Sequence, residues 1–466
     1  MRNSLRNFLR FAVVFLCLGA TRIAYGIDIP AASHRQEDVN KAVASMMSGD
    51  RVLVPAFPPD GACWSQQSTW NLPVNGQVIF AGRDKSTIID CYKPSADKFH
   101  TAGPLIAIYP TPVGRNRVSG FKLKGRASSS NYKYALVGIY GQNKEWRADN
   151  FDVDLTEAVY PDFNWAVPTG FEYWGHVTGV MDHWRLYLAD RGALFIVSYN
   201  NYGGAGTEGD ESWAAPAGFG GPDFLFAEDG EIHNAGNGGV VNDCYRGGKW
   251  VVRRVKLYGA SFGQTHPTGG SHRGRGCRGW EAYDIEVFPG GNGKSNFNGF
   301  FLSSGSGVIT NVVSHPGALS NFITLHNMRF DTKTYTQEAV PYGWGHYPST
   351  YDLVDAPLDQ PGMGQSDLLT GAFPNVRNAA TGCTAIQPCV NPRQKREGVW
   401  LWNNIWHNPN MGGSEIAVYE PTMVEGRDYH RALMPGWSPF PYPHYLTLDN
   451  PGPPPATPQS LRLDSL

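Results

Sequence analysis

The sequence predicts an all-β chain that winds as a parallel β-helix, a solenoid of stacked coils. Two observations lead to this prediction. The 466-residue chain is rich in glycine (55 residues) and aromatic residues (13%) but poor in charged residues (17%), which is typical of turn-dense β structure. Short apolar runs also follow one another from residue 76 to residue 330, with Gly, Asn and Asp at their edges.

A loose repeat favours stacked coils over hairpins. Repeating units that cannot bury their own apolar face must stack on one another. A β-sandwich is the alternative, but it would need hairpins about every 8–12 residues, and Asp229-Gly230 is the clearest two-residue hairpin signal. An apolar residue with polar neighbours recurs at intervals of 23 to 48 residues, at Phe121, Phe151, Trp184, Ile232, Val255, Ile285 and Val312.

Residues 1–26 have the pattern of a secretory signal peptide. Three arginines precede an apolar run at 11–20, and small residues at 24 and 26 suit cleavage. The run is too short to span a bilayer, and no later segment predicts a membrane helix. A lipoprotein signal at Cys17 is the alternative, which the bulky Leu16 disfavours. We therefore expect a secreted protein, extracellular or periplasmic, with no membrane partner.

Charge and cysteine content narrow the class of protein further. Without residues 1–26 the chain has 35 Lys and Arg against 41 Asp and Glu, a net charge of −6. Such a chain is not a general nucleic-acid binder, and we expect a monomer. Six cysteines remain, an even number typical of disulfides in exported chains, and no CxxC spacing indicates zinc. Pairing each cysteine with the next one along the chain gives Cys63–Cys91, Cys244–Cys277 and Cys383–Cys389, and the last pair closes a short loop.

The two ends of the mature chain differ from its middle. Gln36–Ser48 places Val39, Val43 and two methionines on one helical face, and Gly49 can end that helix. The last forty residues are rich in proline and aromatic side chains. The predicted organisation is an N-terminal cap helix at 27–50, a β-helix at 51–425 with loop insertions at 199–221 and 335–395, and an extended C-terminal arm and tail at 426–466.

Five motifs, in order along the chain, carry a resemblance to a known family. They are GDRVLVPA (49–56), HNAGNGGVVNDCYRGGKWVVRRVKLYG (233–259), HRGRGCRGWEAYDIEVF (272–288), VWLWNN (399–404) and the terminal GRDYH…PFPYPHYLTLD. With them, the whole mature chain resembles the pectin lyase-like superfamily, and within it a group of secreted bacterial proteins. The resemblance implies a right-handed parallel β-helix whose open end is covered by the short helix before GDRVLVPA.

The resemblance also implies a chemistry, because enzymes of that superfamily act on acidic polysaccharides in a groove outside the β-helix. Lyases need a base and a positive charge to stabilise an enolate, supplied by Arg, Lys or bound Ca²⁺, whereas hydrolases need two carboxylates. The segment 238–288 supplies candidates. We predict His266 or His272 as the proton-transfer group and Arg254, Arg273 or Arg275 as charge stabilisers, with Arg246, Asp243 and Glu281 contacting substrate.

The alternative for these arginines is structural, as outward ion pairs with Asp243 and Glu281 that brace neighbouring coils. In a strand, Arg253 and Arg254 must point to opposite faces. Arg253 shares its parity with Val251, Val255 and Leu257. This pattern predicts that Arg253 faces the core and that Arg254 faces the outer groove.

Two further segments hold candidates. Val180-Met181-Asp182-His183 resembles the WiDH element of pectate lyases, with Met181 in place of Ile and no Trp before it. The partner Arg-x-Pro-x-x-Arg element is absent, so the Ca²⁺-dependent mechanism is not carried over, and Asp182 capping backbone amides is the structural alternative. In the loop 199–221, Trp213 is a candidate sugar-stacking residue. The nearby acids Glu208, Asp210 and Glu211 are candidate Ca²⁺ ligands, and a solvated surface loop is the alternative.

The sequence thus leaves two functions open. The first is a secreted protein that binds and cleaves an extracellular polysaccharide, uronate-containing polymers among them, as a lyase or a glycoside hydrolase. The second is a non-enzymatic surface or matrix protein whose β-helix is a rigid carbohydrate-binding rod. The chain has no P-loop, no dinucleotide GxGxxG, no HExxH and no GxSxG elbow, so it lacks the sequence signatures of those enzyme classes.

Overall fold

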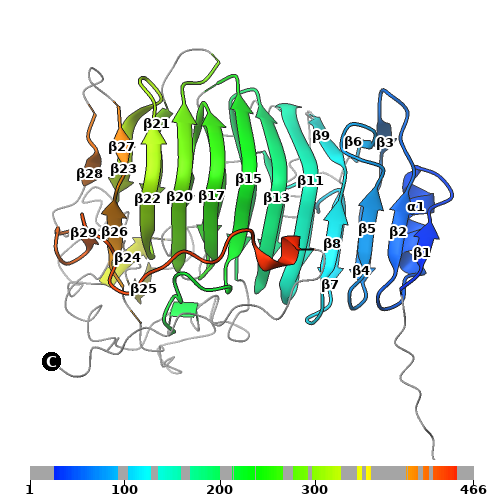
Figure 1. Ribbon diagram of the computed structural model, residues 1–466, viewed down its shortest axis with the longest axis horizontal. Helices are drawn as coiled ribbons and strands as arrows, with labels where there is room; N and C mark the ends of the chain where they lie inside the picture. Colours follow the sequence, from blue (N-terminus) through cyan, green and yellow to red (C-terminus); the bar gives the residue numbers. More distant parts are fainter. Residues whose placement is uncertain are drawn as a thin grey trace, which may run out of the picture.

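The computed structural model is a right-handed parallel β-helix, with its coils stacked side by side from β1 to β29 (Figure 1). It describes residues 26–92, 103–126, 135–158, 168–199, 212–213, 215–236, 238–265, 276–291, 296–326, 344–348, 353–357, 395, 397–407, 413–418 and 423–448. Residues 1–25 of the predicted signal segment 1–26, the Cys383–Cys389 pair, the candidate Ca²⁺ ligands Glu208, Asp210 and Glu211, and four candidate catalytic residues lie outside the described residues. Those four are His266, His272, Arg273 and Arg275.

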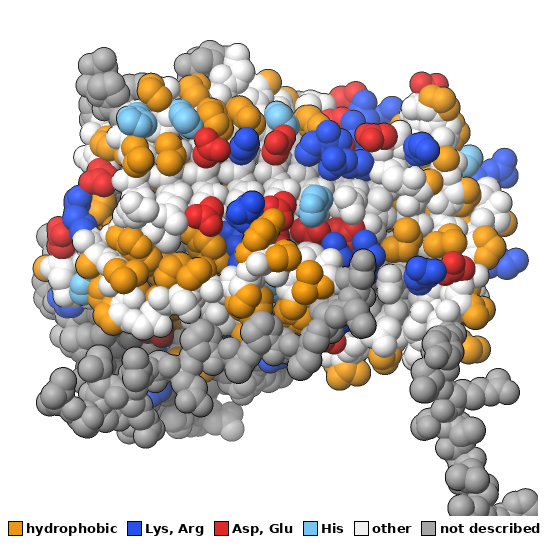
Figure 2. Space-filling view, viewed as in Figure 1, with side chains coloured by type: hydrophobic (Ala, Val, Ile, Leu, Met, Phe, Trp, Pro, Cys, Tyr) orange, Lys and Arg blue, Asp and Glu red, His pale blue; other side chains and the backbone are white. Residues whose placement is uncertain are grey.

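The largest sheet forms the wall that faces the viewer in Figure 1, and Figure 2 shows charged side chains spread across this face. Along its main path the strands follow one another in chain order, each paired in parallel with the next. They are β1 (Asp28–Pro30), β2 (Arg51–Val54), β5 (Gln77–Phe80), β8 (Asn116–Ser119), β11 (Asn143–Glu157), β13 (Val177–Leu188), β15 (Leu225–Asn234), β17 (Lys249–Tyr258), β20 (Gly279–Phe288), β22 (Ser306–Ser314), β26 (Val399–Trp402) and β29 (Tyr429–His430). Beside this path lie β3 (Ala62–Trp64), β6 (Thr87–Asp90), β9 (Lys122–Arg126) and β27 (Ile405–Trp406).

Two smaller parallel sheets complete the coils. One contains β4 (Ser68–Leu72), β7 (Ile106–Pro110), β10 (Val137–Tyr140), β12 (Thr169–Trp174), β14 (Arg191–Ser198), β16 (Gly238–Tyr245) and β18 (Ala260–Ser261). The other contains β19 (Gly263–Thr265), β21 (Asn296–Leu302), β23 (Leu319–Leu325) and β28 (Ile416–Val418). A separate antiparallel pair joins β24 (Trp344–Pro348) to β25 (Leu353–Pro357).

The helix expected over Gln36–Ser48 is α1 (Gln36–Ala44), next to β1 and β2 at the N-terminal end of the solenoid (Figure 1). Its buried residues Val39, Ala42 and Val43 belong to the same apolar core as the coils. The helix ends before the predicted residue because the Ser45 and Met46 N–H groups bond to carbonyls three residues back, at Ala42 and Val43, and Asp50 takes the Met47 N–H. The Oδ2 atom of Asp50 accepts a hydrogen bond from the Met47 N–H at 2.7 Å, which turns the chain toward β2.

Two predicted disulfides are confirmed. Cys63 bonds to Cys91, with the two Cα atoms 5.5 Å apart, and Cys244 bonds to Cys277, with the Cα atoms 5.2 Å apart. The second bond joins the end of β16 to the segment that leads into β20. In the part of the chain that the structure describes, no helix is both long and apolar enough to cross a membrane.

A left-handed residue bends each long strand from β11 to β22 near its middle, and in the next coil the equivalent residue lies between β26 and β27. The strand registers align these residues into one column across the coils, with φ between 50° and 56°. We call them the bend column: Asn150, His183, Asp229, Arg254, Asp284, Asn311 and Asn403. Asp229-Gly230 is therefore a bend inside β15 and not the turn of a hairpin, because Asp229 is a member of this column.

The bend overturns the prediction that Arg253 faces the core. Regular alternation holds only on either side of the left-handed residue, so the residue before the bend and the bend residue both lie outside. In β17, Val252 and Val255 are in the interior core, whereas Arg253 lies on the outer wall beneath the C-terminal segment. Arg254 does face outward as predicted, with 47% of its side chain exposed.

The repeat inferred from the sequence is correct except at one position. Phe121, Phe151 and Trp184 occupy equivalent interior positions in successive coils, and so do Val255, Ile285 and Val312. The equivalent of Trp184 in β15 is Gly230, two residues before the predicted Ile232. A Cβ atom on Gly230 would lie 2.0 Å from the Trp184 indole, so the ring of one coil fills the space that the next coil leaves empty.

The C-terminal arm, which we define as residues 432–448, crosses the outside of the large sheet (red in Figure 1). It runs from Trp437, whose ring contacts Tyr283 and Trp402, to a 3₁₀ helix η4 (Tyr445–Thr447) beside β13. Beneath it lies a second apolar cluster on the outer wall, which includes Val180, Phe226 and Val251 of the sheet and Phe440, Tyr445 and Leu446 of the arm.

Replacing Gly230 by alanine tests how tightly Trp184 packs against the bend. We expect Gly230→Ala to lower the free energy of unfolding by about 1–3 kcal/mol, because the added methyl group overpacks a core site. Chemical denaturation monitored by circular dichroism measures it. Gly291→Ala is the matched control, since its Cβ atom would meet its nearest neighbour at an ordinary 3.5 Å. Equal stability of the two variants would contradict this packing.

Candidate functional site

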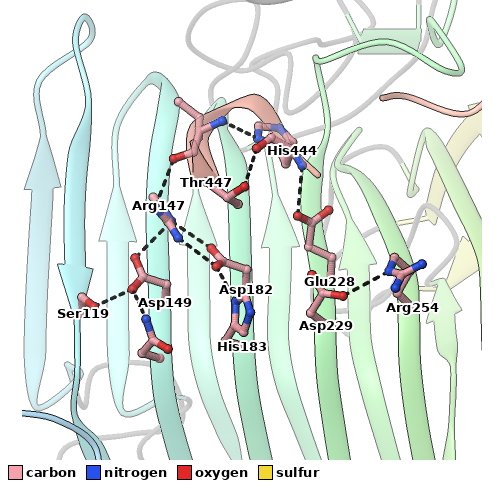
Figure 3. Close-up of polar contacts among 12 residues, drawn as sticks. Ser119, Arg147, Asp149, Asp182, His183, Glu228, Asp229, Arg254, His444 and Thr447 are labelled. Carbon is pink, nitrogen blue, oxygen red and sulfur yellow. Dashed lines mark hydrogen bonds and ion pairs between the residues drawn. The ribbon is translucent and has the colours of Figure 1, made fainter. Parts of the chain in front are cut away.

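Register places a column of polar residues immediately before the bend column. Each coil from β8 to β20 contributes one residue, in the order Ser119, Asp149, Asp182, Glu228, Arg253 and Tyr283. Neighbouring members are separated by one strand spacing, about 4.8 Å. Polar side chains far apart in sequence therefore form a continuous line on the outer wall, of which Figure 3 shows Ser119, Asp149, Asp182 and Glu228.

Asp149 lies near the end of the polar line that the arm does not cover. Its carboxylate accepts hydrogen bonds from Arg117 at 2.5 and 2.9 Å and from the Ser119 hydroxyl at 2.5 Å, and Arg147 lies 3.0 Å away. Burial by itself would raise the pKa of Asp149, but the hydrogen bond from Arg117 and the two guanidinium charges outweigh it and hold that pKa below its usual range. Asp149 therefore remains a carboxylate that joins the strands β8 and β11.

Arg147, Asp182 and His183 form a relay from the wall to solvent (Figure 3). Arg147 donates two hydrogen bonds to Asp182, both at 2.9 Å, and Asp182 is fully buried. The Nδ1 atom of His183 lies 2.8 Å from the second oxygen of Asp182. Because an ionised carboxylate only accepts, Nδ1 carries the hydrogen and the other ring nitrogen is left for solvent or a ligand. The His183 side chain is 58% exposed.

The pKa of His183 is raised above its ordinary value, first by the hydrogen bond with Asp182 and then by the charges of Asp182 and Asp229. Burial and the positive charge of Arg147 oppose this shift but do not cancel it. An exposed imidazole that is oriented by a buried carboxylate suits proton transfer near neutral pH. Asp182 and His183 are thus brought together as a chemically competent pair.

Arg254 lies two coils farther along the bend column. Its Nε atom donates to Asp229 at 3.2 Å, and its guanidinium lies 4.1 Å from the centre of the Tyr442 ring of the arm. The hydroxyl of Tyr442 donates to Asp229 at 3.1 Å. Arg254 therefore lies at the border between the arm and the uncovered wall, with 47% of its side chain exposed.

Five ion pairs near the bend column share one orientation, with the cation outside and the carboxylate inside. Arg253–Glu228 is buried on both sides, and Arg185 also lies 3.8 Å from the exposed Asp84. The cationic side chains keep 30–58% of their surface exposed, whereas the carboxylates keep 0–20%. On this face, exposed Arg and His side chains therefore lie above the more buried carboxylates with which they pair. The pairs are Arg117–Asp149, Arg83–Asp152, Arg185–Asp152, His183–Asp182 and Arg254–Asp229.

The arm covers the rest of the polar line. Arg253 pairs with Glu228 at 2.6 Å and donates to the backbone oxygens of Phe440 and Pro441 at 2.6 and 3.1 Å. Glu281 is fully buried and accepts hydrogen bonds from the Gly220 N–H at 2.6 Å and the Trp437 indole at 3.2 Å. Burial raises the pKa of Glu281 to about 7.

Other predicted site residues lie elsewhere. Asp243 is on β16 in the smaller sheet, and its Oδ1 atom accepts from the adjacent Cys244 N–H. Arg246 follows β16, with its guanidinium 5.1 Å from the centre of the Trp174 ring. The structure therefore does not join these two residues to the relay at His183. Trp213 is almost fully buried, donates to the Gly276 oxygen and lies against Arg278, so it has no exposed face for a sugar ring.

The bracing alternative is present with different partners. Arg254 pairs with Asp229 and Arg253 with Glu228, not with Asp243 or Glu281. Sequence reasoning missed Arg147, Glu228 and the arm contacts. A usable signal existed, because Asp149 and Asp182 each precede a repeat position by two residues. The misplaced repeat position Ile232 hid the corresponding relation between Glu228 and Gly230.

The fold and this wall define a right-handed parallel β-helix protein with a line of charged side chains outside its coils. Neither a protein family model nor a curated protein matches the chain. A search of solved structures finds a likeness to a pectin methylesterase mutant in complex with a hexasaccharide. The TM-score is 0.32 at 8% sequence identity, over 57% of this chain and 89% of that chain.

The relay predicts how His183 titrates. We expect Asp182→Asn to lower the pKa of His183 toward the ordinary value near 6.5, because the substitution removes both the charge and the hydrogen-bonded carboxylate. Nuclear magnetic resonance of the imidazole during a pH titration measures this value. Asp229→Asn is the control, and it should produce a smaller fall in the same direction. An unchanged His183 pKa in Asp182→Asn would refute the relay.

Proposed function

We propose that this chain is an exported protein that binds an acidic polysaccharide along the uncovered outer wall of its large sheet. The observation that carries the proposal is the orientation of the ion pairs near the bend column, which present Arg83, Arg185, Arg254 and His183 to solvent above buried carboxylates. Guanidinium groups recognise carboxylates through paired hydrogen bonds, as a uronate residue would require.

The surroundings of these cations favour a polysaccharide over a nucleic acid. The mature chain has a net charge of −6, and each exposed cation has a carboxylate within 4 Å. A dense row of phosphates would meet this negative charge at every contact, and nucleic-acid binding rests on basic surfaces. A uronate polymer carries one charge on each sugar and has hydroxyl groups that can hydrogen-bond to Asp229 and the amides of the bend column.

Binding measurements with charged and neutral polymers test the proposal. We expect the protein to bind polygalacturonate, to ignore neutral dextran, and to lose about tenfold in affinity with Arg254→Gln, because a charge-assisted hydrogen bond is removed. Lys41→Gln, on α1 at the N-terminal end, is the control with the same change of charge. Isothermal calorimetry measures each dissociation constant.

The pH dependence of binding has a definite sign. The pKa of His183 is raised, so its cationic form persists to higher pH than that of an ordinary histidine. Affinity for polygalacturonate should therefore rise as the pH falls through that raised value, and added salt should weaken it. Equal affinity for polygalacturonate and dextran, or an equal loss in Lys41→Gln, would rule out the assigned surface.

A second candidate function, cleavage of the bound polymer by β-elimination, is favoured by the relay itself. In its neutral form, His183 can accept a proton through the ring nitrogen that Asp182 does not occupy. The proton leaves the carbon next to the uronate carboxyl, the glycosidic C–O bond at the neighbouring carbon breaks, and a double bond remains in the product. The departing sugar oxygen takes its proton from water. Arg254 or Arg185 would stabilise the enolate.

Ultraviolet absorbance of that double bond tests the cleavage. Activity should increase as the pH rises through the His183 pKa, opposite to binding, because only the neutral ring accepts a proton. His183→Asn should lower the rate by about 100-fold or more, whereas Lys41→Gln should not change it. New reducing ends without absorbance would indicate hydrolysis instead. Binding with no product across a panel of polyuronates would eliminate the enzymatic candidate and leave a binding protein.

A further inference from the structure

The wall beneath the arm is a direct continuation of the uncovered wall. The strand registers place Arg147 in one column with Phe226 and Val251, and Asp182 in the adjacent column with Glu228 and Arg253. We call Phe226, Glu228 and Arg253 the covered floor. The covered floor thus belongs to the same two columns as Arg147 and Asp182 of the relay, and the arm separates it from solvent.

The arm and the covered floor do not match in charge. From Ala432 to Leu448 the arm has no Asp, Glu, Lys or Arg. Glu228 and Arg253, however, are almost fully buried beneath it and pair with each other. Buried ion pairs add little stability compared with apolar side chains of similar size. If the arm served only to close the fold, apolar side chains in place of Glu228 and Arg253 would hold it equally well. The presence of these two charges therefore indicates that the covered floor can bind a ligand other than the arm.

The arm fills the covered floor with groups that resemble those of a sugar. The rings of Phe440 and His444 lie 5.1 and 4.8 Å from the centre of the Phe226 ring. Backbone oxygens of Phe440 and Pro441 accept from Arg253, and the His444 N–H donates to Glu228 at 3.2 Å. An aromatic face flanked by a hydrogen-bond donor and a hydrogen-bond acceptor suits a pyranose ring with its hydroxyl groups.

We propose that the covered floor is a second polysaccharide-binding site and that the arm is its resident competitor. The inference rests on the proposed function, because the ligand is the same acidic polymer, extended along the columns from the exposed wall. Arg147 connects the two halves, since it donates to Asp182 on the exposed side and to the Leu446 oxygen of the arm at 3.2 Å. A polymer that takes the place of the arm would receive these donors.

The local sequence allows the arm to leave without unfolding a coil. Four prolines, Pro435, Pro439, Pro441 and Pro443, restrict φ whether the arm is docked or free, so docking costs little entropy and the arm can compete with a ligand for the covered floor. The Arg431–Glu415 ion pair at 2.6 Å holds the chain just before the arm begins. Within the described residues 432–448, no residue belongs to a strand of the three parallel sheets.

Arm substitutions in the full chain test the competition. We expect Phe440→Ala to bind polygalacturonate about fivefold or more tightly than the wild type, because it weakens the competing occupant. Leu433→Ala is the control, since Leu433 lies in the arm but is 60% exposed. By reciprocity, polygalacturonate should accelerate hydrogen exchange of the amides at 437–446 in the wild type. Near-ultraviolet circular dichroism confirms that each variant is folded.

The outcomes separate this inference from the function on which it rests. If the wild type binds but Phe440→Ala binds equally or more weakly, and exchange in the arm is unchanged, the arm is not a competitor and the inference falls. If only Phe440→Ala binds, the covered floor is the site and the exposed wall is not. If neither binds, both proposals fall. Adding Arg253→Gln to Phe440→Ala should cancel the gain in affinity, and a gain that persists would overturn the assignment of the covered floor.

Discussion

The left-handed residue in the middle of each long strand is the constraint on which this wall depends. A non-glycine residue in that conformation costs of order 1–3 kcal/mol, and the bend column repeats it from coil to coil. Asn and Asp tolerate it best, and their side chains recover part of the cost by bonding to neighbours. Asn150 donates to the preceding residue Asp149 at 2.8 Å, whereas Asn311 donates to Asp284 of the neighbouring coil at 3.0 Å and Asn403 donates to Asn311. The bend therefore holds the coils together as well as turning them.

The same bend decides where charge can be placed. Because two consecutive residues lie outside at each bend, every coil offers a pair of adjacent outward positions, such as Asp182 with His183 or Arg253 with Arg254. The first residue of each pair, which precedes the bend-column residue, is crowded by the neighbouring coils and becomes buried, as Asp182 does. A buried carboxylate is stable only when paired, and Arg147 and His183 supply the partners. Exposed cations over buried carboxylates are thus a consequence of the coil geometry.

Much of the fold could be predicted from the sequence because coil stacking leaves a periodic apolar signal. Phe121, Phe151 and Trp184 marked the correct interior positions, and nearby cysteines marked two disulfides. This periodic pattern gave a wrong position in β15, where the interior residue is a glycine with no side chain. Gly230 occupies an interior position with no apolar atom of its own, since Trp184 from the preceding coil fills its place. A pattern of residue types cannot show a space that another coil fills.

The candidate site was less predictable, because strand parity gives the wrong side for Arg253 once a left-handed residue follows it. Nothing local in Lys249–Tyr258 distinguishes Arg254 as that residue, since arginine is not a usual choice for it. The contacts of the arm were also out of reach, since Arg147 and Leu446 are 299 residues apart in sequence. Asp182 and His183 were found because they are adjacent in sequence, whereas Arg147, which orients them, belongs to another coil.

Arg147 makes the exposed and covered halves of the wall interdependent. A guanidinium has five N–H donors in a fixed plane, and here they are divided among Asp182, Asp149 and the backbone oxygen of Leu446. Moving the arm frees one of these donors, and the plane can then rotate toward the carboxylates or toward a ligand. Because Asp182 sets both the ring orientation and the pKa of His183, a change at Leu446 reaches the exposed imidazole through two hydrogen-bonded groups. If the arm leaves as proposed above, we therefore expect the protonation of His183 to respond to arm docking through Arg147 and Asp182.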